Sequence, residues 1–140
     1  MCKIKNLTNI KWIYFNKTIE IDPNYDVGYS TRGHVYYKIG QYEKAISDFN
    51  KALEINPEAP GIYYNRALAY LENGEYDNAL NDFNKAIDIN PKYADAYHDR
   101  GYLYYKKLGE LDKGCADFKK ACELGNCNNY NYVKRSGGCR

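Results

Sequence analysis

Apolar and polar positions along this chain follow a helical period, and the pattern then repeats as a block. In the segment YEKAISDFNKALEINP, which ends at Pro57, apolar residues recur every three or four positions, as on one face of an α-helix. The segment YDNALNDFNKAIDINP, which ends at Pro91, repeats this pattern 34 residues later. A second block precedes each segment, as YSTRGHVYYKIG, YYNRALAYLENG and YHDRGYLYYKKLG. Such a fixed period predicts a solenoid of stacked helical units.

Each repeat is predicted to contain two helices. The first runs from about Asp26 to Ile39, where Gly40 supplies a left-handed stop. The second starts near Tyr42 and ends at Asn56, because Pro57 disfavours helical geometry in the residue before it. The predicted full repeats are residues 26–59, 60–93 and 94–125.

The spacing of aromatic and small residues identifies a family resemblance. Each position of the pattern aromatic, Gly, Tyr, Ala, Phe, Ala, Pro is occupied in the first repeat, by Tyr29, Gly33, Tyr36, Ala45, Phe49, Ala52 and Pro57. This resembles the 34-residue consensus of the tetratricopeptide repeat (TPR) family, three times over about residues 26–125. The resemblance implies an all-α, right-handed superhelical solenoid of antiparallel helix pairs that holds a protein or peptide partner.

Both ends depart from the pattern. Residues 6–23 resemble a partial N-terminal repeat that has only its second helix, with Phe15 at the Phe position. This would leave an open N-terminal edge, which is either a degenerate cap or the site of lost upstream repeats. The third repeat has a one-residue insertion, since Phe118 lies 35 residues after Phe83. Residues 126–140 form a predicted Cys-containing C-terminal capping segment, with a short helix over 128–135.

The family resemblance implies a concave groove lined by the first helix of each repeat. The expected groove residues, rich in Tyr and His, are Ser30, His34, Tyr37, Tyr64, Asn65, Leu68, Asp95, His98, Asp99, Tyr102 and Tyr105. Rigid aromatic side chains provide contact area at a low entropy cost. The alternative is that several of these tyrosines only pack between neighbouring helices.

One ligand chemistry known in this family can be tested against the groove residues. The carboxylate clamp for acidic chaperone tails needs Lys and Asn in the first repeat, Asn in the second, and Lys and Arg in the third. Here Asn65 matches, but the first pair is Ser30 and His34 and the third is Asp95 and Asp99. Two carboxylates in place of cations would repel an acidic tail, so we predict no clamp and a basic or neutral ligand segment.

The other residue patterns do not indicate a catalytic site. Arg32, Arg66 and Arg100 recur at one position, and form either a ladder along the groove or stems that pack on a neighbouring helix with heads in solvent or on a carboxylate. His34 and His98 lie two repeats apart, too far to share a metal. We find no catalytic triad and no phosphate-binding Gly loop, and therefore expect no enzyme activity and no cofactor.

Composition limits the partners. The 140 residues carry a net charge of +2 with both signs interspersed, which argues against a nucleic-acid surface. The sequence contains no run of about 18 apolar residues, the length needed to span a membrane. The N-terminal segment also lacks the features of a signal peptide. This fits a cytoplasmic protein, or a fragment.

The five cysteines are unevenly placed, with Cys2 isolated and Cys115, Cys122, Cys127 and Cys139 near the C-terminus. A chain reversal near Gly125 would allow disulfides Cys115–Cys139 and Cys122–Cys127, and Cys122–Cys139 with Cys115 free is the rival pairing. Free thiols remain an alternative, whereas the spacing does not fit a zinc site. The ending GCADFKKACELGNC resembles bacterial TPR proteins, some of them exported, which would suit disulfides.

Two functions follow from these observations. The first is a scaffold that binds a peptide or helix of a partner protein in the Tyr-rich groove. The alternative is a structural module that forms homo-oligomers through its open N-terminal edge.

Overall fold

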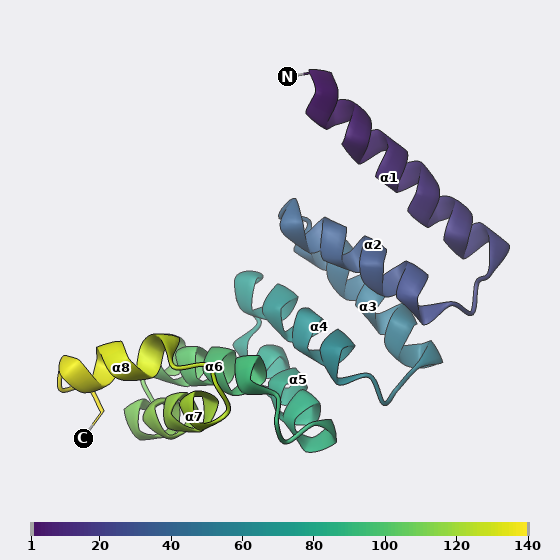
Figure 1. Cartoon of the computed structure of the whole chain (residues 1–140). Helices are drawn as coiled ribbons and strands as arrows, with labels where there is room; N and C mark the ends of the chain where they lie inside the picture. The colour runs from purple at the N-terminus through teal and green to yellow at the C-terminus, as the bar shows by residue number, and fades with distance from the viewer. Residues whose placement is uncertain (1, 140) are drawn as a thin grey trace.

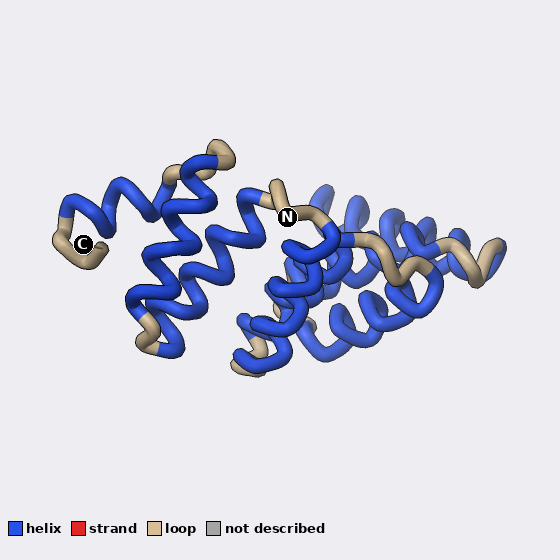
Figure 2. Tube along the Cα trace, turned by 90° about the horizontal axis from the view of Figure 1, so that it is seen from below, coloured by secondary structure: helices blue, strands red, loops and turns tan. Residues whose placement is uncertain are grey.

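The chain is an extended stack of helices. The computed structural model describes the backbone of residues 2–139 and the side chains of residues 12–139. The helices are α1 (Cys2–Ile21), α2 (Asp26–Lys38), α3 (Tyr42–Ile55), α4 (Pro60–Glu72), α5 (Tyr76–Ile89), α6 (Ala94–Tyr102), the π-helix η1 (Leu103–Leu108), α7 (Leu111–Glu123) and α8 (Asn128–Arg135). They follow one another in chain order, with α1 at one end and α8 at the other (Figure 1). Short loops join them, and residues 2–139 contain no strand (Figure 2), so the expected all-α solenoid is confirmed.

Three antiparallel pairs, α2 with α3, α4 with α5 and α6–η1 with α7, form the body of the stack. Within each pair a glycine ends the first helix in a left-handed conformation, with φ of 78° at Gly40, 81° at Gly74 and 70° at Gly109. A residue with a Cβ would be strained there, which explains the recurrence of Gly at this position.

Each pair closes around a phenylalanine. Phe49, Phe83 and Phe118 are 0%, 0% and 1% exposed, and each belongs to the second helix of its pair. The first helix must approach closely to cover the ring. A Cβ added to Gly33 would lie 3.0 Å from the Phe49 ring and 3.2 Å from the carbonyl oxygen of Ala45. The small residues of the repeat therefore set the distance between paired helices.

The extra residue of the third repeat is accommodated inside its first helix. Residues Leu103–Leu108 form a π-helix, in which backbone hydrogen bonds span five residues instead of four. The glycine turn that follows is then unchanged, with Gly109 in the same conformation as Gly40 and Gly74. An insertion that could have lengthened the loop instead widens one helical turn.

The π-helix explains why Gly114 replaces the alanine found at the equivalent positions, Ala45 and Ala79. A Cβ at Gly114 would lie 2.7 Å from the Cβ of Tyr105 and 2.9 Å from the carbonyl oxygen of Gly101. We expect Gly114→Ala to lower the free energy of unfolding by about 1–3 kcal/mol, because backbone atoms must move apart. Chemical denaturation of this variant would measure the loss. Gly61→Ala is the matched control, since a Cβ at Gly61 meets no atom within 4 Å. An equal effect of the two substitutions would contradict the close approach.

The two ends of the stack differ in how well they are covered. Trp12 of α1 packs against Tyr36 with ring centroids 4.7 Å apart. On its other side α1 exposes apolar residues, with Ile13 58%, Tyr14 72% and Ile21 82% exposed. At the opposite end α8 buries Val133 and covers part of α7. Cys2 and the side chains of residues 6–11 in the predicted partial repeat lie outside the described side chains, as does Arg140.

Candidate functional site

A hydrogen-bonded cluster joins the first helices of the second and third pairs. Tyr64 on α4 donates its hydroxyl to Asp99 Oδ2 on α6 at 2.7 Å. The other oxygen of Asp99 lies 2.8 Å from His98 Nδ1. These three residues, all predicted from the sequence to line a groove, are therefore linked through the carboxylate of Asp99. Burial, followed by the charge and hydrogen bond of Asp99, raises the pKa of Tyr64, so the phenol stays protonated and acts as the donor.

Tyr37 on α2 shares the electrostatic environment of this cluster. Burial, and then the carboxylate of Glu72, the phenol of Tyr42 and the carboxylate of Asp99, raise its pKa. Side chains from α2, α4 and α6 therefore act on one another across the surface of the first helices. Burial, and then the carboxylates of Asp95 and Asp99, also raise the pKa of Tyr93, so acidic groups lie near several of these phenols.

The remaining predicted residues on these helices have mixed roles. His34 and Tyr102 are exposed, but partial burial of the imidazole, followed by the charge of Lys38, still lowers the pKa of His34. Asn65 is half-buried, and Leu68 packs on the core around Phe83. Two others make hydrogen bonds of their own, one within α2 and one to the turn between α7 and α8. Ser30 donates to the carbonyl of Val27 at 3.2 Å, and Asp95 accepts from Asn126 at 2.8 Å.

Tyr105 is not brought together with the others. Its ring packs against Phe118 at 5.9 Å between centroids, and its hydroxyl points to Gly138 in the C-terminal segment. The π-helix is the reason, because the extra residue rotates the positions that follow it. Counted back from the glycine turn, Tyr105 corresponds to the packing residues Tyr36 and Tyr70. Lys106 therefore corresponds to the groove position that was expected for Tyr105.

One residue of this surface, Tyr93, was not predicted from the sequence. It directly precedes α6, and its ring packs at a tilt against that of Tyr64, with centroids 5.0 Å apart. The signal was available, because Tyr25 precedes α2 in the same way. It was overlooked because Tyr93 lies before the helix and not within it.

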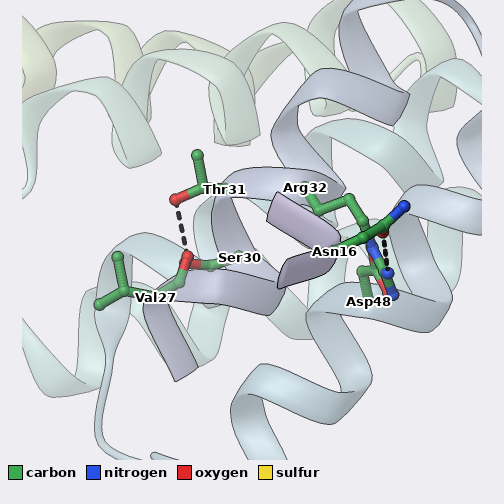
Figure 3. Close-up of polar contacts among 6 residues, drawn as sticks. All are labelled: Asn16, Val27, Ser30, Thr31, Arg32 and Asp48. Carbon is green, nitrogen blue, oxygen red and sulfur yellow. Dashed lines mark hydrogen bonds and ion pairs between the residues drawn. The ribbon is translucent and has the colours of Figure 1, made fainter. Parts of the chain in front are cut away.

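A second polar system runs through the stack, and Figure 3 shows its first member. Arg32 on α2 binds both carboxylate oxygens of Asp48 on α3, at 2.7 and 2.8 Å, and donates to Asn16 on α1 at 2.9 Å. One guanidinium thus ties its own helix pair to the preceding helix. Of the two alternatives for the three arginines, the structure shows the one with the head on a carboxylate.

The same arrangement, which we call a rung, occurs in each pair. The second rung is Arg66, Asp82 and Asn50, and the third is Arg100, Asp117 and Asn84, with all contacts between 2.6 and 2.8 Å. The three aspartates are almost buried, at 5%, 6% and 7% exposed. Burial disfavours the charge on Arg66, but the hydrogen bonds and charge of Asp82 outweigh it and raise the pKa of Arg66. The aspartates and asparagines recur with the repeat period, so the rungs leave a periodic signal in the sequence.

The four C-terminal cysteines are paired in the structure as Cys115 with Cys139 and Cys122 with Cys127. The first pair joins α7 to the segment that follows α8, with Cα atoms 5.5 Å apart. The second pair closes the turn between α7 and α8. We propose that these pairs hold the C-terminal cap in place.

No helix in the described residues is long and apolar enough to cross a membrane. Within the same residues, no three His, Cys, Asp or Glu side chains gather in a way that could hold a metal ion.

Family models match most of the chain. A TPR-repeat model matches residues 33–74 and 69–107, and two tetratricopeptide-repeat models match residues 14–47 and 94–124. No curated protein sequence matches the chain.

Solved structures with the same fold are known TPR proteins. A crystal structure of MamA is 28% identical, with a TM-score of 0.74 over 79% of this chain and 64% of MamA. The first TPR of Spaghetti (RPAP3), bound to the HSP90 peptide SRMEEVD, is 28% identical, with a TM-score of 0.72 over 79% of this chain and 91% of that one. The Arabidopsis OM64 TPR domain is 29% identical, with a TM-score of 0.74 over 81% of this chain and 93% of that domain. The chain thus spans less than two thirds of the MamA structure.

The helix pairs, the small residues around each phenylalanine and the family-model matches agree with one another. The chain belongs to the tetratricopeptide-repeat family.

Proposed function

We propose that this chain is a scaffold that holds a peptide or helix of a partner protein against the surface of its first helices. A TPR array is a protein-interaction module, and the RPAP3 domain of similar structure binds a peptide. The observation that carries the proposal is the linked cluster of Tyr64, Asp99 and His98, which fixes polar and aromatic groups across two repeats. Rigid side chains of this kind bind a partner with little loss of conformational entropy.

The charge of this surface favours a basic or neutral ligand segment. Glu72, Asp95 and Asp99 surround the phenols of Tyr37 and Tyr64 and raise the pKa of one or both. A ligand carboxylate placed here would be repelled, whereas a Lys or Arg side chain would be attracted. The proposal therefore excludes a carboxylate clamp.

We expect the acidic peptide SRMEEVD to show no saturable binding to this chain up to about 1 mM, where a binding free energy is only about −4 kcal/mol. Fluorescence anisotropy of the labelled peptide would measure this. The RPAP3 domain is the positive control, since its structure contains the peptide. Binding at micromolar concentration would contradict the proposed charge preference, although the scaffold function could still hold.

A test of the scaffold function requires peptides that bind this chain. We expect peptides selected from a displayed random library to bind a His34→Ala, Tyr102→Ala double variant at least about tenfold more weakly than the unmodified chain, because both side chains are exposed on the proposed surface. Tyr132→Ala is the matched control, since Tyr132 is 71% exposed on α8 at the far end of the stack. Equal binding by the unmodified chain and the double variant would overturn the proposed binding surface.

The alternative function is self-assembly through the N-terminal edge. Its support is the exposed apolar side of α1, formed by Ile13, Tyr14 and Ile21. In the described residues no helix covers this side. Static light scattering over a range of concentrations separates the two functions. A mass that rises with concentration in the unmodified chain, and not in an Ile13→Ser, Tyr14→Ser variant, would favour assembly, whereas a constant monomer mass would exclude it.

A further inference from the structure

A cavity of about 750 Å³ lies at the C-terminal end of the stack, away from the proposed binding surface. It opens between α7, α8 and the segment that follows α8. The residues that line it are Leu111, Asp112, Cys115, Ala116, Lys119, Tyr130, Lys134, Gly137, Gly138 and Cys139. Both polar and apolar groups are present, and two of the polar groups are ammonium ions.

These two lysines occupy the positions of a fourth rung. Lys134 is the seventh residue of α8, the helix after the third pair, as Arg66 and Arg100 are the seventh residues of α4 and α6. Lys119 follows Asn84 by 35 residues, the spacing that the insertion imposes. In the three complete rungs, the arginine and the asparagine at these positions meet beside a buried aspartate. The fourth rung thus has two cationic members.

In the described residues no aspartate completes this fourth rung. In each complete pair it comes from the second helix, where Asp48, Asp82 and Asp117 each directly precede the core phenylalanine. After α8 the chain instead turns back, and Cys139 reaches Cys115 on α7. The space that a second helix would fill beside Lys119 and Lys134 is therefore the cavity.

Neither lysine has a carboxylate partner among residues 12–139. Lys134 only lies over the ring of Tyr130, with 5.7 Å from Nζ to the centroid, and Lys119 makes no ion pair. Asp112 also lines the cavity, but it precedes Lys119 by seven residues and so lies about 10 Å away along the helix. The two ammonium groups thus lie at one end of the cavity, and the carboxylate of Asp112 lies at the other end.

We propose that this cavity binds an acidic helical segment of a partner protein, whose carboxylate takes the place of the missing rung aspartate between Lys119 and Lys134. A helix is the occupant that the repeat geometry favours, because every complete pair fills the equivalent space with one. Ala116, one turn before Lys119, supplies apolar contact near the lysines, and the half-exposed Leu111 does so at the other end of the cavity. The chain would then have two binding surfaces of opposite charge, one on the first helices and one at the cap.

The chain itself supplies a suitable probe. A fluorescently labelled, end-blocked peptide with the sequence of α5, Tyr76–Ile89, presents Asp82 as a second helix does. We expect it to bind the full chain saturably, and to bind Lys119→Gln and Lys134→Gln variants each about fivefold more weakly, the effect of one partly exposed ion pair. Anisotropy titrations would give these values. Lys85→Gln is the matched control, because Lys85 is exposed on α5, outside the cavity.

A peptide with Asp82→Asn makes the test specific to the rung. It should bind the unmodified chain about fivefold more weakly, and its affinity should not change further in the two lysine variants, because the interaction has already been removed. The Tyr102→Ala variant should bind the unmodified peptide normally, which separates this site from the proposed binding surface. The proposal is overturned if the α5 peptide does not bind saturably, or if the Asn peptide and the lysine variants bind as the unmodified pair does.

Discussion

Replacement of Asp82 by alanine should lower the free energy of unfolding by about 3–5 kcal/mol, the largest effect that we expect from a single polar residue in this chain. Asp82 is 6% exposed and accepts two hydrogen bonds from Arg66, at 2.6 and 2.7 Å. Without it the guanidinium, itself largely buried, would lose its charge partner in a medium that solvates it poorly. Asn50 would be left as its only partner in the rung.

Chemical denaturation would measure this effect, with Asp88→Ala as the matched control. Asp88 lies on the same helix but is exposed, and its replacement should change stability by less than about 1 kcal/mol. A double variant Arg66→Met, Asp82→Leu should be more stable than Asp82→Ala alone, because it leaves no buried charge unpaired. If Asp82→Ala costs no more than Asp88→Ala, the rung does not stabilise the stack.

The second large effect concerns the proposed disulfide between Cys115 and Cys139. Its cysteines are 24 residues apart, and closing a loop of that length stabilises the closed structure by about 3 kcal/mol. The helix inside this loop, α8, has only eight residues and buries only Val133. A helix of this length is not stable by itself. We expect Cys139→Ser to accelerate amide hydrogen exchange in α8 by about 100-fold while exchange in α3 and α5 stays unchanged, because each repeat depends mainly on its neighbours.

Cys2→Ser serves as the control for this experiment. A thiol count in denaturant should find one free thiol per chain before reduction and five after it. Four or more free thiols before reduction would refute both proposed disulfides. Unchanged exchange in Cys139→Ser would instead mean that packing alone holds α8.

Much of the fold could be predicted from the order of residues alone. The helices and their ends are encoded locally, by the period of apolar positions and by residues such as Gly40 and Pro57 that stop a helix wherever they occur. The recurrence of Phe49 as Phe83, with small residues at fixed distances, shows that the same helix pair is built repeatedly. Local signals of this kind need no knowledge of distant contacts, so the sequence was sufficient.

The candidate site was predictable only in part. Tyr64, His98 and Asp99 were identified as members of one surface, because equivalent positions on successive first helices must face the same way. The hydrogen bond between Tyr64 and Asp99 was not foreseen, since it depends on the distance between two repeats. Tyr105 was misplaced for a related reason. One inserted residue can be taken up in a loop or in a π-turn, and only the packing of Gly114 against Tyr105 decides between them.

The sequence by itself thus determined the helices, their number per repeat and the family of the fold, because these follow from short-range patterns that recur every 34 residues. Tertiary structure decided which polar groups meet. The arginine of each rung finds an aspartate 16 or 17 residues away and an asparagine of the preceding repeat, and these contacts form only when three helices have packed together. Within residues 12–139 the same packing places Lys119 and Lys134 beside one cavity and gives neither the aspartate partner that each complete rung contains.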